Sequence, residues 1–171
     1  MALRGAIVLV SVAMAVSGCQ TSTPATAPTF APEADTTTTA APVVQAGPFG
    51  TTLTVTESGA TAAYTVSNLR PVPVDAQIVP PRGTMYAVDV VIDAQTGTTA
   101  YNGYYFVAKA ADGVNFPPAI GAVRPDVDSG KLTAGQSLSA HVAFDVPEGQ
   151  AITRVVLRDP KGNALAVWGI A

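Results

Sequence analysis

The stretch that decides the fold is Tyr86-Ala87-Val88-Asp89-Val90-Val91-Ile92-Asp93. Successive side chains of a β-strand point to opposite faces of a sheet, so this period of two puts residues 86, 88, 90 and 92 on one apolar face. The carboxylates of Asp89 and Asp93 point the other way. The pattern predicts a long strand with one buried and one solvated face.

A second stretch repeats the pattern near the end of the chain. Apolar side chains stand at positions 138, 140, 142, 144 and 146, while Ser139, His141 and Asp145 take the outward positions between them. This alternation predicts a second strand with its apolar face turned to the same core.

Shorter alternating segments surround these two strands. They are Thr51–Glu57, Ala62–Leu69, Tyr104–Ala110, Val114–Phe116, Thr153–Leu157 and Ala164–Trp168. The turn-rich connection 159–163 joins the last two into a predicted hairpin, and Arg70–Gly83 and Pro117–Gly135 are predicted loops. No amphipathic helix of ordinary length follows residue 18. Residues 49–171 are therefore predicted to form one all-β domain, an immunoglobulin-like antiparallel β-sandwich of about seven strands.

The N-terminus predicts export. Val16-Ser17-Gly18-Cys19 resembles the lipobox of bacterial lipoproteins, in which the cysteine is acylated before cleavage on its amino side. A basic start and an apolar run from Ala6 to Val16 precede it, as in signal peptides. That run is shorter than the roughly 20 apolar residues that span a bilayer. We expect a signal peptide at 1–18, cleavage between Gly18 and Cys19, and lipid attachment at Cys19; the alternative is ordinary secretory cleavage nearby, giving a soluble protein.

Charge and cysteine content limit the partners. Removal of residues 1–18 takes away Arg4 and leaves eight Lys and Arg against twelve Asp and Glu, a net charge of −4. Such a chain is poorly suited to nucleic acid or to membrane attachment through a basic patch, which leaves the acyl chains as the anchor. Cys19 is the only cysteine, so the domain has no disulfide and must be stable through its core alone.

Residues 19–48 carry the acylated cysteine and a segment rich in Thr, Pro and Ala with almost no large apolar residue. This composition predicts a disordered linker, which as a flexible coil would reach roughly 30 Å. We interpret it as a tether through an envelope layer. It is typical both of a plain linker and of an O-glycosylated stalk.

The domain carries a family resemblance in three blocks and a closing strand. Tyr86–Asp93, Phe106–Phe116, the Gly135-Gln136 turn that leads into Val142–Val146, and the strand with Trp168 are similar in order and spacing to the secreted immunoprotective antigen family of mycobacteria. The resemblance covers most of residues 49–171. It implies a small immunoglobulin-like sandwich, a location outside the cytoplasm, and antigenicity, with no established enzyme activity and no catalytic residues. Members of that family are typically released, so a related group of bacterial lipoproteins with such sandwich domains fits the anchor better.

No catalytic or metal-binding set is found in the sequence. His141 is the only histidine, which excludes a site built on two imidazoles, and no Gly-x-Ser-x-Gly elbow surrounds Ser137 or Ser139. Residues 126–130 resemble the opening of a calcium loop, but Ser137 stands where the distal Glu is needed, so a solvated turn is expected. Asp89 and Asp93 would lie roughly 13 Å apart, too far for a carboxylate pair. We therefore expect no cofactor, no metal and no enzyme activity.

Three tyrosines are the candidate partner surface. Tyr101, Tyr104 and Tyr105 begin one predicted strand, and alternation would send Tyr104 and Tyr105 to opposite faces, leaving one exposed. The alternative is that Tyr104 fills the core while Tyr105 covers a sheet face. Trp168 is expected to pack in the core or at a sheet edge rather than to stack on a ligand.

These observations predict a lipid-anchored, exported protein of the cell envelope, on the extracytoplasmic face of the membrane or released from it. Its domain would be a non-catalytic binding module and surface antigen, with an envelope or host protein or a glycan as partner. The alternative is a structural envelope component or secreted antigen without a specific ligand. Lipid carriage would need an apolar cavity of several hundred Å³, whereas a sandwich of this size is expected to be packed solid.

Overall fold

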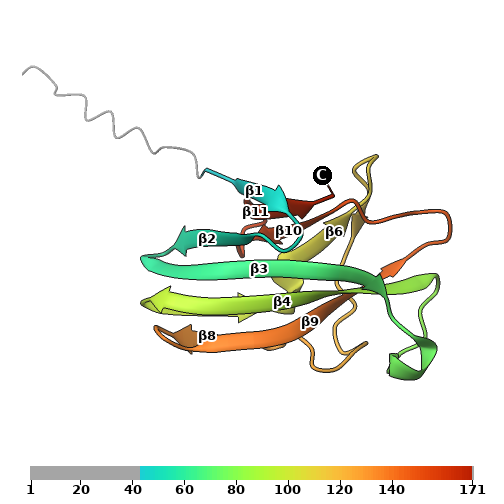
Figure 1. Cartoon of the computed structure of the whole chain (residues 1–171), viewed down its shortest axis with the longest axis horizontal. Coiled ribbons are helices and arrows are strands. Elements are labelled where there is room, and N and C mark those ends of the chain that lie inside the picture. Colours follow the sequence, from blue (N-terminus) through green and yellow to red (C-terminus); the bar gives the residue numbers. More distant parts are fainter. Residues whose placement is uncertain (1–42, 171) are drawn as a thin grey trace, which may run out of the picture. The chain divides into compact units, whose positions relative to one another are not determined.

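The computed structural model describes residues 43–170, which form the predicted immunoglobulin-like β-sandwich (Figure 1). The predicted signal peptide, Cys19 and the predicted linker as far as residue 42 lie outside the described residues. Within residues 43–170, no helix is long and apolar enough to cross a membrane.

One layer is a five-stranded sheet in the order β1-β11-β10-β6-β7, and the other is a four-stranded sheet in the order β2-β3-β4-β9. The strands of the first are β1 (Gln45–Pro48), β11 (Ala164–Gly169), β10 (Arg154–Arg158), β6 (Phe106–Lys109) and β7 (Asn115–Phe116). Those of the second are β2 (Thr52–Glu57), β3 (Ala60–Pro71), β4 (Thr84–Thr96) and β9 (Ser137–Val146). A separate pair consists of β5 (Thr98–Asn102) and β8 (Ser129–Thr133), and two short 3-10 helices are η1 (Val74–Ala76) and η2 (Gly103–Tyr105).

The two stretches with the clearest period of two form the centre of the four-stranded sheet and its edge. β4 and β9 pair antiparallel, with Val88 opposite Val142 and Val90 opposite Ala140. All four side chains are buried against the other sheet, where Phe106 and Trp168 are also fully buried. Alternation therefore identified the core face correctly.

A second, smaller core lies on the outer face of the four-stranded sheet. Met85 and Ala143 are buried there beneath Ala122 and Val123, which belong to a connecting segment. That segment also bonds to the free edge of β9, where Ala119 N donates to Ala143 O at 2.7 Å. The predicted loop Pro117–Gly135 thus covers both a sheet face and a sheet edge, which protects β9 from pairing with another chain.

The structure differs from the predicted elements in three places. β1 comes from the segment assigned to the linker and pairs in parallel with β11. β8 lies within the predicted loop Pro117–Gly135 and pairs with β5. The strand expected over 104–110 begins only at Phe106, because the side chain of Asn102 accepts a hydrogen bond from Tyr104 N (2.9 Å) and closes a 3-10 turn.

Candidate functional site

The three tyrosines are separated by the 3-10 turn η2. Tyr104 is 65% exposed, whereas Tyr101 and Tyr105 are half-buried and pack against the core. One tyrosine of the adjacent pair is exposed as expected, but the alternative that placed Tyr104 in the core is wrong. Strand alternation does not apply to these two residues, since they lie in a turn and not in β6.

Tyr101 lies over a glycine of the neighbouring strand. Tyr101 in β5 is the register partner of Gly130 in β8, and a side chain on Gly130 would collide with the tyrosine ring. The ring therefore occupies the space that the glycine leaves. Tyr101 serves mainly to hold the β5–β8 pair together, which leaves Tyr104 as the outward member of the cluster.

Tyr105 lines a cleft of about 180 Å³ together with Tyr64, Thr99 and Glu57. Burial, together with the charges of Glu57 and Tyr105, raises the pKa of Tyr64 to about 12, so its hydroxyl stays protonated. Burial and the charge of Asp159 also raise the pKa of Glu57, against a smaller effect of Lys161. Thr99 Oγ1 is buried without a hydrogen-bond partner among the described residues. The cleft offers hydroxyl groups and one carboxylate, but no nucleophile activated by a base.

Among the described residues, the cluster around Asp89 most resembles a catalytic set. Its carboxylate accepts hydrogen bonds from Asn68 Nδ2 and Arg70 NH1, each at 2.7 Å, and His141 Nδ1 lies 2.8 Å from Asp89 Oδ1. Burial alone would raise the pKa of Asp89, but the hydrogen bonds of Asn68 and Arg70 and the charge of Arg70 outweigh it and hold the pKa below its usual range. His141 is half-buried, less open to solvent than its outward strand position suggested.

No nucleophile completes this arrangement. Ser137 Oγ donates to Asp93 Oδ1, and Ser139 is the register partner of Val91. Neither serine is hydrogen-bonded to His141 in the segment of the chain that the structure describes. Over the same residues, no group of three or more His, Cys, Asp or Glu side chains is placed to hold a metal ion. The cluster is best explained as a polar cross-strand contact between β3, β4 and β9.

The expectation of a solvated turn at residues 126–130 is wrong for Asp126. Instead of standing in a solvated turn, it is only 8% exposed, and its Oδ2 accepts a hydrogen bond from Gly121 N. Burial raises the pKa of Asp126, and hydrogen bonds from Gly121 and Val127 offset this incompletely. The carboxylate faces the protein because residues 119–127 fold onto β9, a long-range contact that the local sequence does not reveal.

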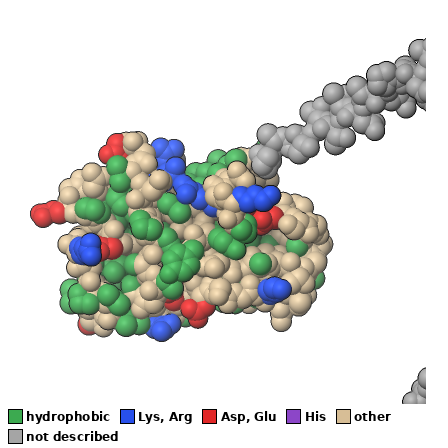
Figure 2. All heavy atoms as spheres, turned by 180° about the vertical axis from the view of Figure 1, so that it is seen from behind, with side chains coloured by type: hydrophobic (Ala, Val, Ile, Leu, Met, Phe, Trp, Pro, Cys, Tyr) green, Lys and Arg blue, Asp and Glu red, His purple; other side chains and the backbone are tan. Residues whose placement is uncertain are grey.

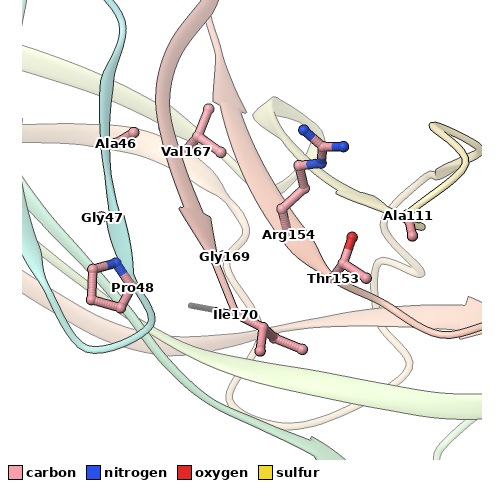
Figure 3. A pocket seen from close by; sticks show the side chains of 9 residues that line it. All are labelled: Ala46, Gly47, Pro48, Ala111, Thr153, Arg154, Val167, Gly169 and Ile170. Atoms are coloured by element: carbon pink, nitrogen blue, oxygen red, sulfur yellow. The ribbon is translucent and has the colours of Figure 1, made fainter.

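A hollow of about 600 Å³ was not predicted from the sequence. It lies on the outer face of the five-stranded sheet, across β1, β11 and β10. Seen from behind, the molecule shows several Lys and Arg side chains on its upper part beside hydrophobic ones, and others at the left, bottom and lower right of the view (Figure 2). In the close view, Ala46 and Pro48 stand on one side and Arg154 and Thr153 on the other, with Val167 between them (Figure 3). Residues of β1 line the groove. The groove could not be predicted because residues 45–48 were assigned to the linker.

Comparisons with known proteins agree with this architecture. A family model described as "Domain of unknown function (DUF1942)" matches residues 44–168. The crystal structure of MPT63, a secreted protein from Mycobacterium tuberculosis, superposes with a TM-score of 0.65 at 23% identity, over 74% of this chain and 98% of that one. The ycdA protein of Bacillus subtilis, provisionally described as a lipoprotein, gives a TM-score of 0.52 at 10% identity, over 72% of this chain and 38% of that one. Comparison with curated proteins gives no match. At these identities the two structures indicate a common fold.

Proposed function

This chain belongs to the DUF1942 family, and on that premise we propose that it is an exported, lipid-anchored protein of the cell envelope whose domain binds a partner without catalysis. It would act on the extracytoplasmic face of the membrane and be a surface antigen. The alternative is a structural envelope component or a released antigen without a specific ligand.

Export and anchoring are supported by the N-terminal sequence. Val16-Ser17-Gly18-Cys19 follows a basic start and an apolar run of signal-peptide length. The fold is shared with a secreted mycobacterial protein and with a Bacillus protein provisionally described as a lipoprotein, and both descriptions fit an exported protein. Two or more acyl chains on Cys19 would hold the protein stably at the membrane.

One observation carries the binding role: Tyr104 is 65% exposed in a turn fixed by the Asn102 side chain. A tyrosine held in this way offers a large contact area and loses little conformational entropy on binding, which is typical of binding hot spots. Its neighbour Tyr105 lines the hydroxyl-bearing cleft, so a protein or glycan seated on Tyr104 would also meet polar groups.

Anchoring is tested by replacing the cysteine. In cells that process lipoproteins, Cys19→Ala is expected to prevent acylation. It should either leave the uncleaved precursor, which is seen as a larger product, or release a soluble protein, which enters the aqueous phase on Triton X-114 partitioning. Ser22→Ala, just outside the lipobox, is the matched control and should partition as wild type. If wild type leaves the detergent phase as readily as Cys19→Ala, the protein is not a lipoprotein.

Binding is tested by photo-crosslinking in intact cells. A benzoylphenylalanine at position 104 is expected to give a discrete adduct, whereas the same group at Thr54, an exposed position of β2, should give none. Prior replacement of Asn102 by Ala should weaken the adduct, because Tyr104 would lose the turn that fixes it. A correctly anchored protein that gives no adduct at position 104 would favour the structural alternative.

A further inference from the structure

We propose that the groove on the outer face of the five-stranded sheet binds a single-chain acidic amphiphile, a molecule with an apolar body and one carboxylate or phosphate head. The site shares no lining residue with the cleft beside Tyr104 and does not depend on the binding role proposed for that tyrosine. It also differs from lipid carriage in a hollow core, since the groove lies outside a packed sandwich.

The floor of the groove is apolar because outward positions of three strands meet there. Pairing of β1 with β11 places Ala46 beside Val167 and Pro48 beside Gly169. Ile170, just after β11, is 67% exposed and extends the apolar surface. An apolar ligand that covers these side chains would remove them from water, and this lowers the free energy of the bound state.

Cations stand along one side of this floor. Arg154 in β10 is the register partner of Lys109 in β6, so the two positive side chains point outward from directly opposite positions. Together they place two positive charges side by side on one sheet face.

Among residues 43–170, no carboxylate forms an ion pair with Arg154 or Lys109. Over residues 43–170, the ion pairs form only at Asp89, on the other sheet. Like charges directly opposite each other on neighbouring strands destabilise a sheet. The Arg154–Lys109 pair is therefore an unfavourable arrangement that an anion would relieve, and this points to a negatively charged ligand.

The apolar floor of the groove and the cations beside it together define the class of ligand. The planar guanidinium of Arg154 suits two-point binding of a carboxylate or phosphate, and Lys109 beside it adds a second positive charge. Thr153, whose N–H and hydroxyl both donate to Lys109 O, is fixed at the same rim. An apolar chain extending from the bound head would lie over Val167 and Pro48. A purely ionic ligand would leave this floor uncovered, and a neutral or cationic one would leave the charges unpaired.

The fold allows a variant that fills the groove. Gly169 lies on the floor, and a Cβ built there would lie 3.4 Å from Thr153 O and 3.7 Å from Arg154 Cβ, both ordinary contacts. Gly169→Val should therefore fold while its side chain occupies the space meant for the apolar body. The second variant, Arg154→Gln, removes the positive charge from an exposed position, and Lys131→Gln, an exposed cation of β8, is its matched control.

The test titrates the mature chain, carrying Cys19→Ser to exclude its own acyl groups, with monomeric decanoate or decyl phosphate while amide NMR shifts are recorded. Both probes are expected to shift residues 46–48, 153–154 and 167–170. Arg154→Gln should weaken binding about tenfold or more, the value of a hydrogen bond to a charged group. Gly169→Val should abolish binding, and Lys131→Gln should bind as wild type.

Three further probes separate the alternatives. Decyltrimethylammonium, with the same chain and the opposite charge, and inorganic phosphate, with no chain, are both expected to leave these amides unshifted. Vesicles of phosphatidylglycerol should compete no better than vesicles of phosphatidylcholine. The proposal is overturned if the cationic probe binds as well as decanoate, if Arg154→Gln binds as tightly as wild type, or if anionic vesicles bind while monomeric probes do not.

Discussion

The indole Nε1 of Trp168 donates a 2.8 Å hydrogen bond to the carbonyl oxygen of Thr51, joining the last strand to the segment between β1 and β2 across 117 residues of sequence. Trp168 is fully buried, so this bond satisfies the only polar atom of its side chain within the core. The tryptophan is thus a core residue that also positions the start of the domain.

Trp168→Phe should keep most of the apolar contact and lose this hydrogen bond. Because the Thr51 carbonyl would be left without its partner, the free energy of unfolding should fall by about 1 to 3 kcal/mol. Trp168→Ala, which also opens a cavity, should cost about 3 to 5 kcal/mol. Urea denaturation measures both, and equal stability of Trp168→Phe and wild type would contradict a role for the bond.

Asp89 should contribute to the stability of the domain at neutral pH. Its folded-state pKa lies below the unfolded value of about 3.9, so its contribution is fully present above that value and is lost as the pH falls through the folded pKa. Asp89→Asn should be less stable than wild type at pH 7 and should lose less stability between pH 5 and pH 3. Asp128→Asn, which removes an exposed carboxylate, should stay within about 0.5 kcal/mol of wild type at pH 7. Parallel pH curves for wild type and Asp89→Asn would refute this role.

Asp126 should behave in the opposite sense. Burial raises its pKa, so the folded state holds the proton more tightly, and stability falls as the pH rises from the unfolded value through the folded one. Asp126→Asn keeps an oxygen for Gly121 N without a buried charge. It should be at least as stable as wild type at pH 7, with no advantage below about pH 4. Thermal melts at several pH values test this, and calcium should not raise the wild-type melting temperature.

Tyr104 and Tyr105 should differ in stability although they are adjacent. Tyr104→Ala removes an exposed ring and should change the free energy of unfolding by no more than about 0.5 kcal/mol. Tyr105→Ala removes a ring packed against the core and should cost about 2 kcal/mol or more. Denaturation of both single variants decides the matter; a similar loss for each would mean that Tyr104 is a packing residue and not a binding one.

The fold was predictable where one face of a strand is apolar along its whole length. In β4 and β9 the period of two identified the buried residues, because burial between two sheets selects apolar side chains at every second position. The terminal hairpin of β10 and β11 was equally clear from its turn. The prediction depended on local pattern, which these elements carry in full.

The remaining elements depend on contacts between distant segments. β1 has four residues, of which only Gly47 is not exposed, so its sequence QAGP carries no strand signal, and pairing with β11 alone makes it a strand. Thr133 and Leu132 in β8 have partners in β5 that are more than thirty positions away. The tyrosine turn depends on a side-chain bond from Asn102. The groove was invisible for the same reason, since it forms only when β1 lies beside β11.

The parallel pairing of β1 with β11 has a mechanical consequence. β1 enters the pair at Gln45 and β11 leaves it at Gly169, and the two strands run in the same direction through four register pairs. If force were applied at Gln45 and the chain were held at Gly169, the force would act along both strands. It would load all their hydrogen bonds at the same time, in shear. An antiparallel hairpin pulled at its two open ends would instead break its hydrogen bonds one after another. A domain tethered through its N-terminal side would therefore resist a pulling force with all the hydrogen bonds between β1 and β11 together.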